Sequence, residues 1–260
     1  MVITQTPLRL SFAGGGSDFA EFYRDGAGKV ISTAIDKYIF VIVKERFDDK
    51  IVLNYSSKEI VDEVSEIKHE LIREAMLKTG LKCGVEISTL ADIPSEGSGL
   101  GSSSSLIVGL LNALYMFKGD QVPSERLAEE ACEIEIERCG KPIGKQDQFI
   151  AAYGGLRTLT FNPEGSVSTE RVKMSAKSRW QFGTHLMLFY TYRTRSSSDI
   201  LTEQKRETKR MRKTLEAMLP LVDRIRDSLI SGNFDDVGYA LHEGWMLKRE
   251  MASKISDPQI

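Results

Sequence analysis

One stretch limits the folds open to this chain more than any other. Residues 94–105, PSEGSGLGSSSS, run directly into the apolar segment LIVGLLNALYMF. The apolar segment predicts a buried helix from about residue 103 to 117. The first backbone N–H groups of a helix have no intrahelical partner, and the helix dipole adds positive charge there. A glycine-rich loop entering such a helix can therefore cradle phosphate, and its serine hydroxyls can donate to phosphate or bind Mg²⁺.

The same loop can also be a plain connection with a serine N-cap, and its local pattern leaves this alternative open. It is not a Walker A loop, because no Gly-Lys-Ser/Thr follows. The GSGLG spacing, without an acidic strand end at the expected distance, also differs from the dinucleotide fingerprint. The phosphate interpretation therefore depends on residues elsewhere in the chain.

The remaining patterns predict an α+β protein without the regular alternation of a doubly wound parallel sheet. We expect strands at residues 3–13, 30–35, 38–44, 51–55, 84–90, 156–161, 171–174 and 185–192. We expect helices at residues 18–23, 66–79, 103–117, 124–140, 146–153, from 198 through Met218, 221–231 and 235–251. Residues 1–174 are predicted to form one domain and residues 175–260 a second, with the 185–192 strand buried.

Charge and cysteine usage point to a cytoplasmic enzyme or binding protein. The net charge of -2 favours neither nucleic acid nor an anionic membrane as a partner. The basic run KRETKRMRK contains glutamate at helical spacing and is typical of a solvated helix face. The three cysteines lack CxxC spacing and indicate thiols in a reducing compartment. We expect no signal peptide, and no apolar run reaches the roughly 18 residues that span a bilayer.

The first strand carries candidate residues where it ends in AGGGSDF. Arg9 lies on the face opposite Leu8 and Leu10, and three glycines followed by an aspartate permit close approach of a ligand. Asp18 can accept hydrogen bonds from sugar hydroxyls or cap the short helix that follows it.

Two acidic segments supply further candidates. In GKPIGKQDQF, Asp147 can deprotonate or orient a hydroxyl, or simply cap a helix. In EIEIER, residues two apart on a helix point to different sides, so at most one of Glu133, Glu135 and Glu137 should face inward. A single inward carboxylate suits Mg²⁺ when phosphates complete the coordination sphere.

A second anion site is possible in TYRTRSSSDIL, where Arg193 and Arg195 precede a serine-rich helix start. Guanidinium groups grip phosphate with two hydrogen bonds, although a salt bridge or a capped loop explains the pattern equally well.

TPLRLSFAGGGSDF, PSEGSGLGSSSS and GKQDQFIAAYGG, in this order and spacing, resemble the GHMP small-molecule kinases. The AGGGSD and GKQDQ forms, VDEVSEIKHELIREAM and TRSSSDIL are most similar to the branch that phosphorylates a heptose 7-phosphate. The resemblance implies an N-terminal domain like ribosomal protein S5 and a ferredoxin-like C-terminal domain. It further implies ATP-dependent phosphorylation of the anomeric hydroxyl, for nucleotide-activated heptose in surface polysaccharides.

Roles for individual residues follow from the resemblance alone. Asp147 and Arg9 match catalytic positions, and Glu135 with Ser103 matches the Mg²⁺ site. Asp18 matches a sugar-binding position, and Arg195 matches the arginine expected to hold the phosphate of the heptose. Gly15, Gly16 and Gln146 are assigned to the same substrate site. The ATP loop would comprise Pro94, Gly97, Ser98, Gly99, Leu100, Gly101, Ser102, Ser103, Ser104 and Ser105.

One family motif has no counterpart in this chain. The glycine-rich KxxGAGxGG stretch is missing before the chain stops at SDPQI, so we expect an incomplete C-terminal domain. Two alternatives to the heptose phosphate kinase therefore stay open: a kinase for a fucose- or galactose-like sugar, or an inactive nucleotide-binding fragment. The expected partners are ATP and a phosphorylated sugar, without nucleic acid or membrane, and a homodimer is left open.

Overall fold

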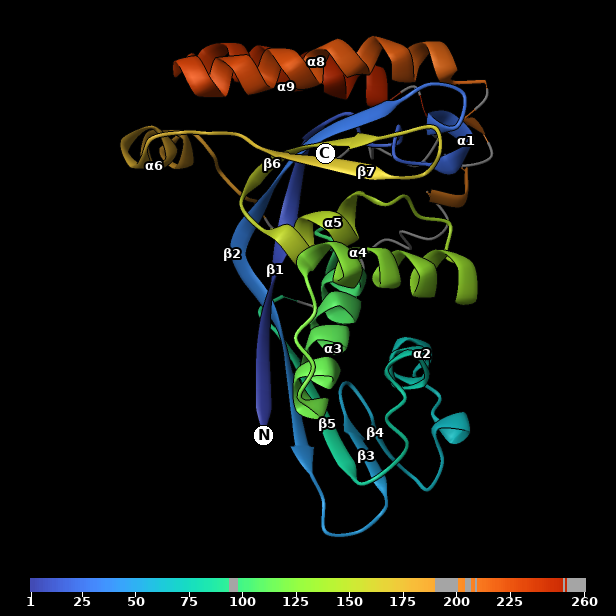
Figure 1. Cartoon of the computed structure of the whole chain (residues 1–260). Coiled ribbons are helices and arrows are strands. Elements are labelled where there is room, and N and C mark those ends of the chain that lie inside the picture. Colours follow the sequence, from blue (N-terminus) through green and yellow to red (C-terminus); the bar gives the residue numbers. More distant parts are fainter. Residues whose placement is uncertain (94–97, 190–200, 204–206, 209, 250, 252–260) are drawn as a thin grey trace. The chain divides into compact units, whose positions relative to one another are not determined.

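The structure of the protein is a computed structural model, which describes residues 1–93, 98–189, 201–203, 207–208, 210–249 and 251. Helices and strands are mixed along the chain, as the sequence predicts (Figure 1). The chain forms two compact units, each assembled from separate segments. Unit 1 comprises Met1–Arg9, Ala34–Lys141 and Asp147–Gly154, and unit 2 comprises Leu10–Thr33, Pro142–Gln146 and Gly155–Ile260. The domain boundary predicted between residues 174 and 175 stays a prediction, because these units follow contacts in space and not a single cut.

Two long strands contribute residues to both units. They are β1 (Val2–Ala13) and β2 (Gly28–Glu45), and they pair with each other. The prediction of two strands at 30–35 and 38–44 was wrong, because β2 runs through Asp36 and Lys37 without a break. Both of these side chains are exposed, so the strand can carry them without burying a charge.

Unit 1 contains a sheet in the order β4-β3-β5-β2. Its β2–β5 pairing is antiparallel and its β3–β5 pairing is parallel. The further elements of this unit are β3 (Ile51–Asn54), β4 (Lys58–Val61), η1 (Val64–Glu66), α2 (Glu70–Thr79), β5 (Val85–Ala91), α3 (Ser102–Lys118), α4 (Ser124–Cys132), η2 (Glu133–Arg138) and α5 (Gln146–Tyr153), the first residue of α5 belonging to unit 2.

The core of unit 1 lies between this sheet and the helices α2 and α3. Val41, Leu53 and Ile87 on the strands and Ile107 and Leu110 on α3 are fully buried in one cluster. Burial on this scale contributes about 1.5–3 kcal/mol per large aliphatic side chain. The apolar segment after the glycine-serine loop is therefore the helix that closes the core, as predicted.

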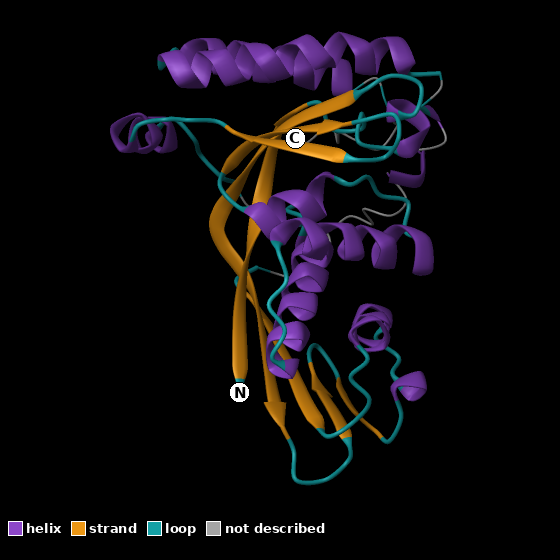
Figure 2. Ribbon diagram, viewed as in Figure 1, coloured by secondary structure: helices purple, strands orange, loops and turns teal. Residues whose placement is uncertain are grey.

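In unit 2, the β2 segment pairs with β6 (Leu156–Phe161), and β6 pairs with β7 (Val167–Arg171) in an antiparallel hairpin (Figure 2). The strand predicted at 171–174 instead begins at Val167. The turn is closed by hydrogen bonds from the N–H of Gly165 to the Asn162 carbonyl (2.8 Å) and from the N–H of Asn162 to the Ser166 carbonyl (2.9 Å). Pairing can therefore start directly after this turn.

The remaining elements of unit 2 are α1 (Ala20–Tyr23), α6 (Ala176–Thr184), α8 (Arg212–Ser231) and α9 (Phe234–Lys248). Helices α8 and α9 lie side by side (Figure 1), and Val222, Ile225 and Val237 are buried against Ile31 of β2. Helix α8 continues through Pro220 instead of ending before residue 221 as predicted. The proline removes one backbone hydrogen bond, but burial on both sides of it outweighs that loss.

The strand predicted at 185–192 was wrong for its described part. His185–Phe189 form no strand, and Met187, Leu188 and Phe189 are 81%, 67% and 75% exposed. An apolar run becomes a buried strand only when another strand pairs with it, and no described strand does. Residues 190–192 and the predicted helix start at Ser198 lie outside the described residues. Within the described part of the chain, no helix combines the length and the apolar character that a bilayer crossing requires.

Candidate active site

The described part of the glycine-serine loop is fixed to strand β1. The N–H of Arg9 donates to the Leu100 carbonyl (3.1 Å), and Nη1 of Arg9 donates to the Gly99 carbonyl (2.5 Å). The hydroxyl of Ser105 donates to the Pro7 carbonyl (2.8 Å). The loop is therefore held in one place where it enters α3. Pro94 and Gly97 of the predicted loop lie outside the described residues.

Helix α3 starts with Gly101 as its N-cap, in the left-handed conformation with φ 77°. A Cβ at this position would lie 3.2 Å from Cγ of Arg9 and 3.2 Å from Oδ2 of Asp147. Glycine thus serves twice here: it adopts the left-handed turn, and it lets two functional side chains approach the loop backbone. The first N–H groups of α3 follow directly, which is the geometry of an anion cradle.

The four serines of this helix start divide by exposure. Ser103 is exposed and Ser102 half-buried, whereas Ser104 and Ser105 are 3% and 1% exposed. The hydroxyls of Ser104 and Ser105 donate to Glu135 and to the Pro7 carbonyl. Of these four serines, only Ser102 and Ser103 are therefore exposed enough to present a hydroxyl at the surface of the loop.

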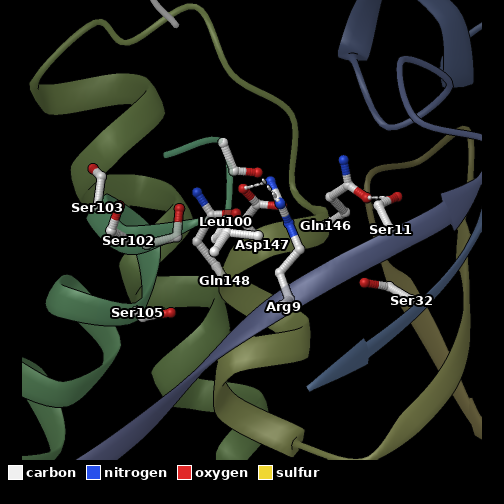
Figure 3. Close-up of polar contacts among 12 residues, drawn as sticks. Arg9, Ser11, Ser32, Leu100, Ser102, Ser103, Ser105, Gln146, Asp147 and Gln148 are labelled. Carbon is white, nitrogen blue, oxygen red and sulfur yellow. Dashed lines mark hydrogen bonds and ion pairs between the residues drawn. The ribbon is translucent and has the colours of Figure 1, made fainter. Parts of the chain in front are cut away.

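Arg9 and Asp147, 138 residues apart in the sequence, form a bidentate ion pair (Figure 3). Nε of Arg9 lies 2.6 Å from Oδ1 of Asp147, and Nη2 lies 2.5 Å from Oδ2. The two side chains are 14% and 21% exposed. Because a guanidinium fork fixes both the distance and the plane of a carboxylate, Asp147 is held in one orientation beside the loop.

Glu135 is the single inward-facing carboxylate of its segment, as predicted. It is fully buried on the π-helical turn η2, whereas Glu137 is exposed and Glu133 pairs with Lys78 and Arg138. A π-helical turn widens the helix by one residue and is frequent at functional sites.

Several donors surround the Glu135 carboxylate. The hydroxyl of Ser103 donates to Oε1, and Ser104 and Nε2 of Gln148 donate to Oε2 at 2.6 and 2.7 Å. Nζ of Lys141 lies 3.9 Å from Oε1 and 3.2 Å from the Ser103 hydroxyl. Burial raises the pKa of Glu135 above its usual range, against the lowering effect of these hydrogen bonds and of Lys141.

This donor set fits Mg²⁺ when a nucleotide supplies further oxygens. A carboxylate and a hydroxyl are hard oxygen ligands, and Mg²⁺ commonly takes one or two protein ligands beside phosphates. Among the described residues, no group of three or more His, Cys, Asp or Glu side chains could hold a metal without such help.

Sequence reasoning missed Lys141 and Gln148 as partners of this carboxylate. Both lie in the segment that carries Asp147. Their polar character alone does not indicate that they interact, like Ser103, with the carboxylate of Glu135. The N–H of Lys141 bonds to the Glu135 carbonyl (2.9 Å), which brings the lysine back to the carboxylate after the turn.

In unit 2, Asp18 is 3% exposed and joins two loops. Oδ1 accepts from the N–H of Gly16 (2.9 Å), and Oδ2 accepts from the N–H of Gln146 (3.3 Å). A Cβ at Gly144 would lie 1.9 Å from Oδ2, so glycine is required there. The helix-cap alternative for Asp18 was wrong, because the N-cap of α1 is Phe19 and no side chain caps it.

Other predicted sugar-site residues lie in the same unit. The hydroxyl of Ser11 donates to Oε1 of Gln146 (2.9 Å; Figure 3). Gly15 lies beside them, 3.7 Å from Nε2 of Gln146 when measured to an added Cβ. The structure thus brings Gly15, Gly16, Asp18 and Gln146 together, whereas Arg195 lies outside the described residues.

Comparison with known proteins agrees with this geometry. The family model of the GHMP kinases N terminal domain matches residues 54–155. D-glycero-alpha-D-manno-heptose 7-phosphate kinase of Campylobacter jejuni is 30% identical over 277 residues, covering 99% of this chain and 80% of that protein.

Solved structures show the same fold. A D-glycero-D-manno-heptose 1-phosphate kinase from Bacteroides thetaiotaomicron superimposes with a TM-score of 0.79 and 25% identity, covering 97% of this chain and 80% of that chain. Streptococcus pneumoniae phosphomevalonate kinase has a TM-score of 0.77 at 16% identity, covers 99% of this chain and 83% of that chain, and is similar in fold alone. The chain therefore belongs to the GHMP kinase family, and within it to the sugar kinases.

Proposed function

We propose that this sugar kinase transfers the γ-phosphoryl group of ATP to the anomeric hydroxyl of D-glycero-D-manno-heptose 7-phosphate. The product would be the 1,7-bisphosphate, which leads to nucleotide-activated heptose for surface polysaccharides. The observation that carries the proposal is the 30% identity, over 99% of this chain, to a protein named as a heptose 7-phosphate kinase. None of the three cysteines, all of which the structure describes, forms a disulfide, which supports a reducing cytoplasm as the place of the reaction.

The loop would bind the phosphates of ATP through backbone and serine donors. The N–H groups that open α3 have no intrahelical partner and can donate to an anion, and Ser102 and Ser103 are half-buried and exposed at this helix start. The contacts from Arg9 to Gly99 and Leu100 keep this cradle in place before the nucleotide arrives. Such preorganisation is what phosphoryl transfer chiefly requires.

Asp147 would accept the hydrogen bond of the sugar hydroxyl. Each carboxylate oxygen has two lone pairs, so the two bonds from Arg9 leave further acceptor capacity on both oxygens. The sugar oxygen bonds to the γ-phosphorus while the bond to the ADP oxygen breaks, and the hydroxyl proton departs along the hydrogen bond to Asp147. The guanidinium of Arg9 offsets negative charge that develops beside it.

Glu135 and Ser103 would hold Mg²⁺, which supplies positive charge to the phosphates. Ser104 and Gln148 orient the carboxylate of Glu135 from its other oxygen, and Lys141 adds a positive charge on the exposed side. Partners of this kind fix a ligand before the metal binds.

The test is ADP release with ATP, Mg²⁺ and a panel of acceptors: heptose 7-phosphate, unphosphorylated heptose, fucose and galactose. We expect turnover with heptose 7-phosphate at a kcat/KM at least tenfold above the others. Equal or better use of fucose or galactose would refute the proposed substrate. Asp147→Ala should lose turnover by at least 100-fold, an effect of the size expected for general acid–base groups. Calorimetry with a nonhydrolysable ATP analogue should show nucleotide binding retained in this variant.

A further inference from the structure

The three glycines of the AGGGSD turn differ in what a side chain would meet. Gly14 has φ +86°, and a Cβ there would lie 1.9 Å from the carbonyl oxygen of Lys29. Gly16 has φ +106°, and its Cβ would lie 3.0 Å from Cδ2 of Leu215. Backbone conformation and close packing therefore explain these two glycines.

Gly15 is different, because its φ lies outside the left-handed region. A Cβ there would meet no backbone and no apolar side chain as its nearest neighbours. It would lie 3.3 Å from Nζ of Lys248, 3.7 Å from Nε2 of Gln146 and 3.8 Å from Oγ of Ser11. The position that a Cβ of Gly15 would take is therefore bordered by three polar side-chain atoms, and glycine leaves that position unfilled by its own side chain.

The groups around this position are mainly donors. The Ser11 hydroxyl donates to Oε1 of Gln146 (Figure 3). The other end of this amide, its NH₂ group, is the part of Gln146 that lies nearest to Gly15. The ammonium of Lys248 carries three donors and no acceptor. The carboxylate of Asp18, which would repel an anion, accepts the backbone N–H groups of Gly16 and Gln146. A positive charge beside amide donors matches the oxygens of a phosphate group.

We propose that Lys248, with Gln146, binds the phosphate of the sugar substrate over Gly15 and makes the enzyme prefer a phosphorylated sugar. Lys248 is the last residue of α9, and Gln146 directly precedes Asp147 in the chain. The inference rests on the proposed function, because it assigns the phosphate of the same acceptor.

The test compares KM for heptose 7-phosphate with KM for unphosphorylated heptose in three variants. Lys248→Met removes the charge at similar length, and Arg249→Met removes the neighbouring charge as a matched control. Gly15→Ala fills this position with a methyl group that the backbone conformation permits. We expect Lys248→Met to raise KM for heptose 7-phosphate at least tenfold and to leave KM for ATP and for the unphosphorylated sugar within twofold. Gly15→Ala should raise KM for the phosphorylated sugar without loss of thermal stability.

Inorganic phosphate provides a second readout, since it should compete with heptose 7-phosphate in the wild type and in Arg249→Met but not in Lys248→Met. Lys248→Arg should restore most of the preference. If Lys248→Met raises KM for both sugars equally, or for neither, the inference is overturned while the proposed substrate stands. If the wild type itself shows no preference for the 7-phosphate, the proposed substrate falls and the inference falls with it. The two failures are therefore distinguishable from the wild-type data.

Discussion

Replacement of Glu135 by glutamine separates what this carboxylate does for stability from what it does for the metal. Glutamine keeps the size of the side chain but carries no charge. The carboxylate is fully buried, and burial raises its pKa above the ordinary value of 4.5. The folded chain therefore holds this proton at pH values where the unfolded chain has lost it.

The sign of the pH dependence follows from this difference. Stability associated with Glu135 is fully present below the unfolded pKa near 4.5 and is lost as pH rises through the folded pKa. The loss is at most about 1.4 kcal/mol per pH unit for one proton. Glu135→Gln lacks this loss. The free energy of unfolding of the variant should therefore increase relative to that of the wild type as pH rises. In the presence of Mg²⁺ and nucleotide, the free energy of unfolding of the wild type should instead increase relative to that of the variant. Ligand at a hundredfold excess over its Kd stabilises the wild type by about 2.7 kcal/mol, and the variant should lose most of this gain.

Urea unfolding of both proteins from pH 4.5 to 8, with and without Mg²⁺ and a nonhydrolysable ATP analogue, measures both effects. Ser104→Ala is a suitable control, because it removes one donor to the same carboxylate and keeps the charge. Parallel pH profiles for wild type and Glu135→Gln, together with equal stabilisation by Mg²⁺ and nucleotide, would refute both the titration and the metal role.

Three further predictions concern the loop and the core. Gly101→Ala should cost about 1–2 kcal/mol of stability for the left-handed backbone, and should lower kcat because its methyl group lies 3.2 Å from Oδ2 of Asp147; an unchanged kcat would contradict the close approach. Ser103→Ala should weaken Mg²⁺-dependent nucleotide binding in calorimetry with little change in Tm. Ser105 is 1% exposed, so Ser105→Ala should lower the free energy of unfolding by about 0.5–1.5 kcal/mol and leave nucleotide affinity unchanged. Burial tends to raise the pKa of Glu59, but the hydrogen bonds that it accepts lower it overall. The stabilisation that Glu59 contributes is therefore present above the unfolded pKa near 4.5 and lost as pH falls through the folded pKa. Glu59→Gln should lower the free energy of unfolding by about 1.5–3 kcal/mol at pH 7, and urea unfolding should show a weaker pH dependence of stability on the acid side.

The sequence was most informative where local pattern and burial coincide. The helix predicted from about residue 103 begins at Ser102, and the loop in front of it supplied the turn signal. It was least informative where tertiary contacts decide the outcome. Strand β2 tolerates exposed Asp36 and Lys37 because its flanking residues are paired on both sides of them. The apolar residues 185–189 look like a buried strand, but an apolar run does not specify its own partner.

The sequence predicted which residues belong to the candidate site, but it did not predict which of them contact one another. Arg9 and Asp147 were each compatible with an ordinary surface role, and only the resemblance to a family placed them in one site. The structure adds the bidentate geometry between them. Lys248 carried no signal at all, because a lysine near the end of a helix is common on protein surfaces. Its place beside Gly15 depends on the packing of α9 within unit 2, against α8 and β2, which no local pattern encodes.

The surroundings of each glycine therefore say more about function than the glycine motif itself. Gly14 and Gly16 are explained by backbone conformation and packing, and would be needed in a protein that bound nothing at this turn. Gly101 combines a left-handed backbone with contacts to two functional side chains, so structural and functional demands coincide there. Of these four glycines, only Gly15 has neither a left-handed backbone nor a close backbone neighbour, and its side chain would meet polar side-chain atoms. A glycine that the fold does not require is the one whose replacement by alanine tests ligand binding without testing folding.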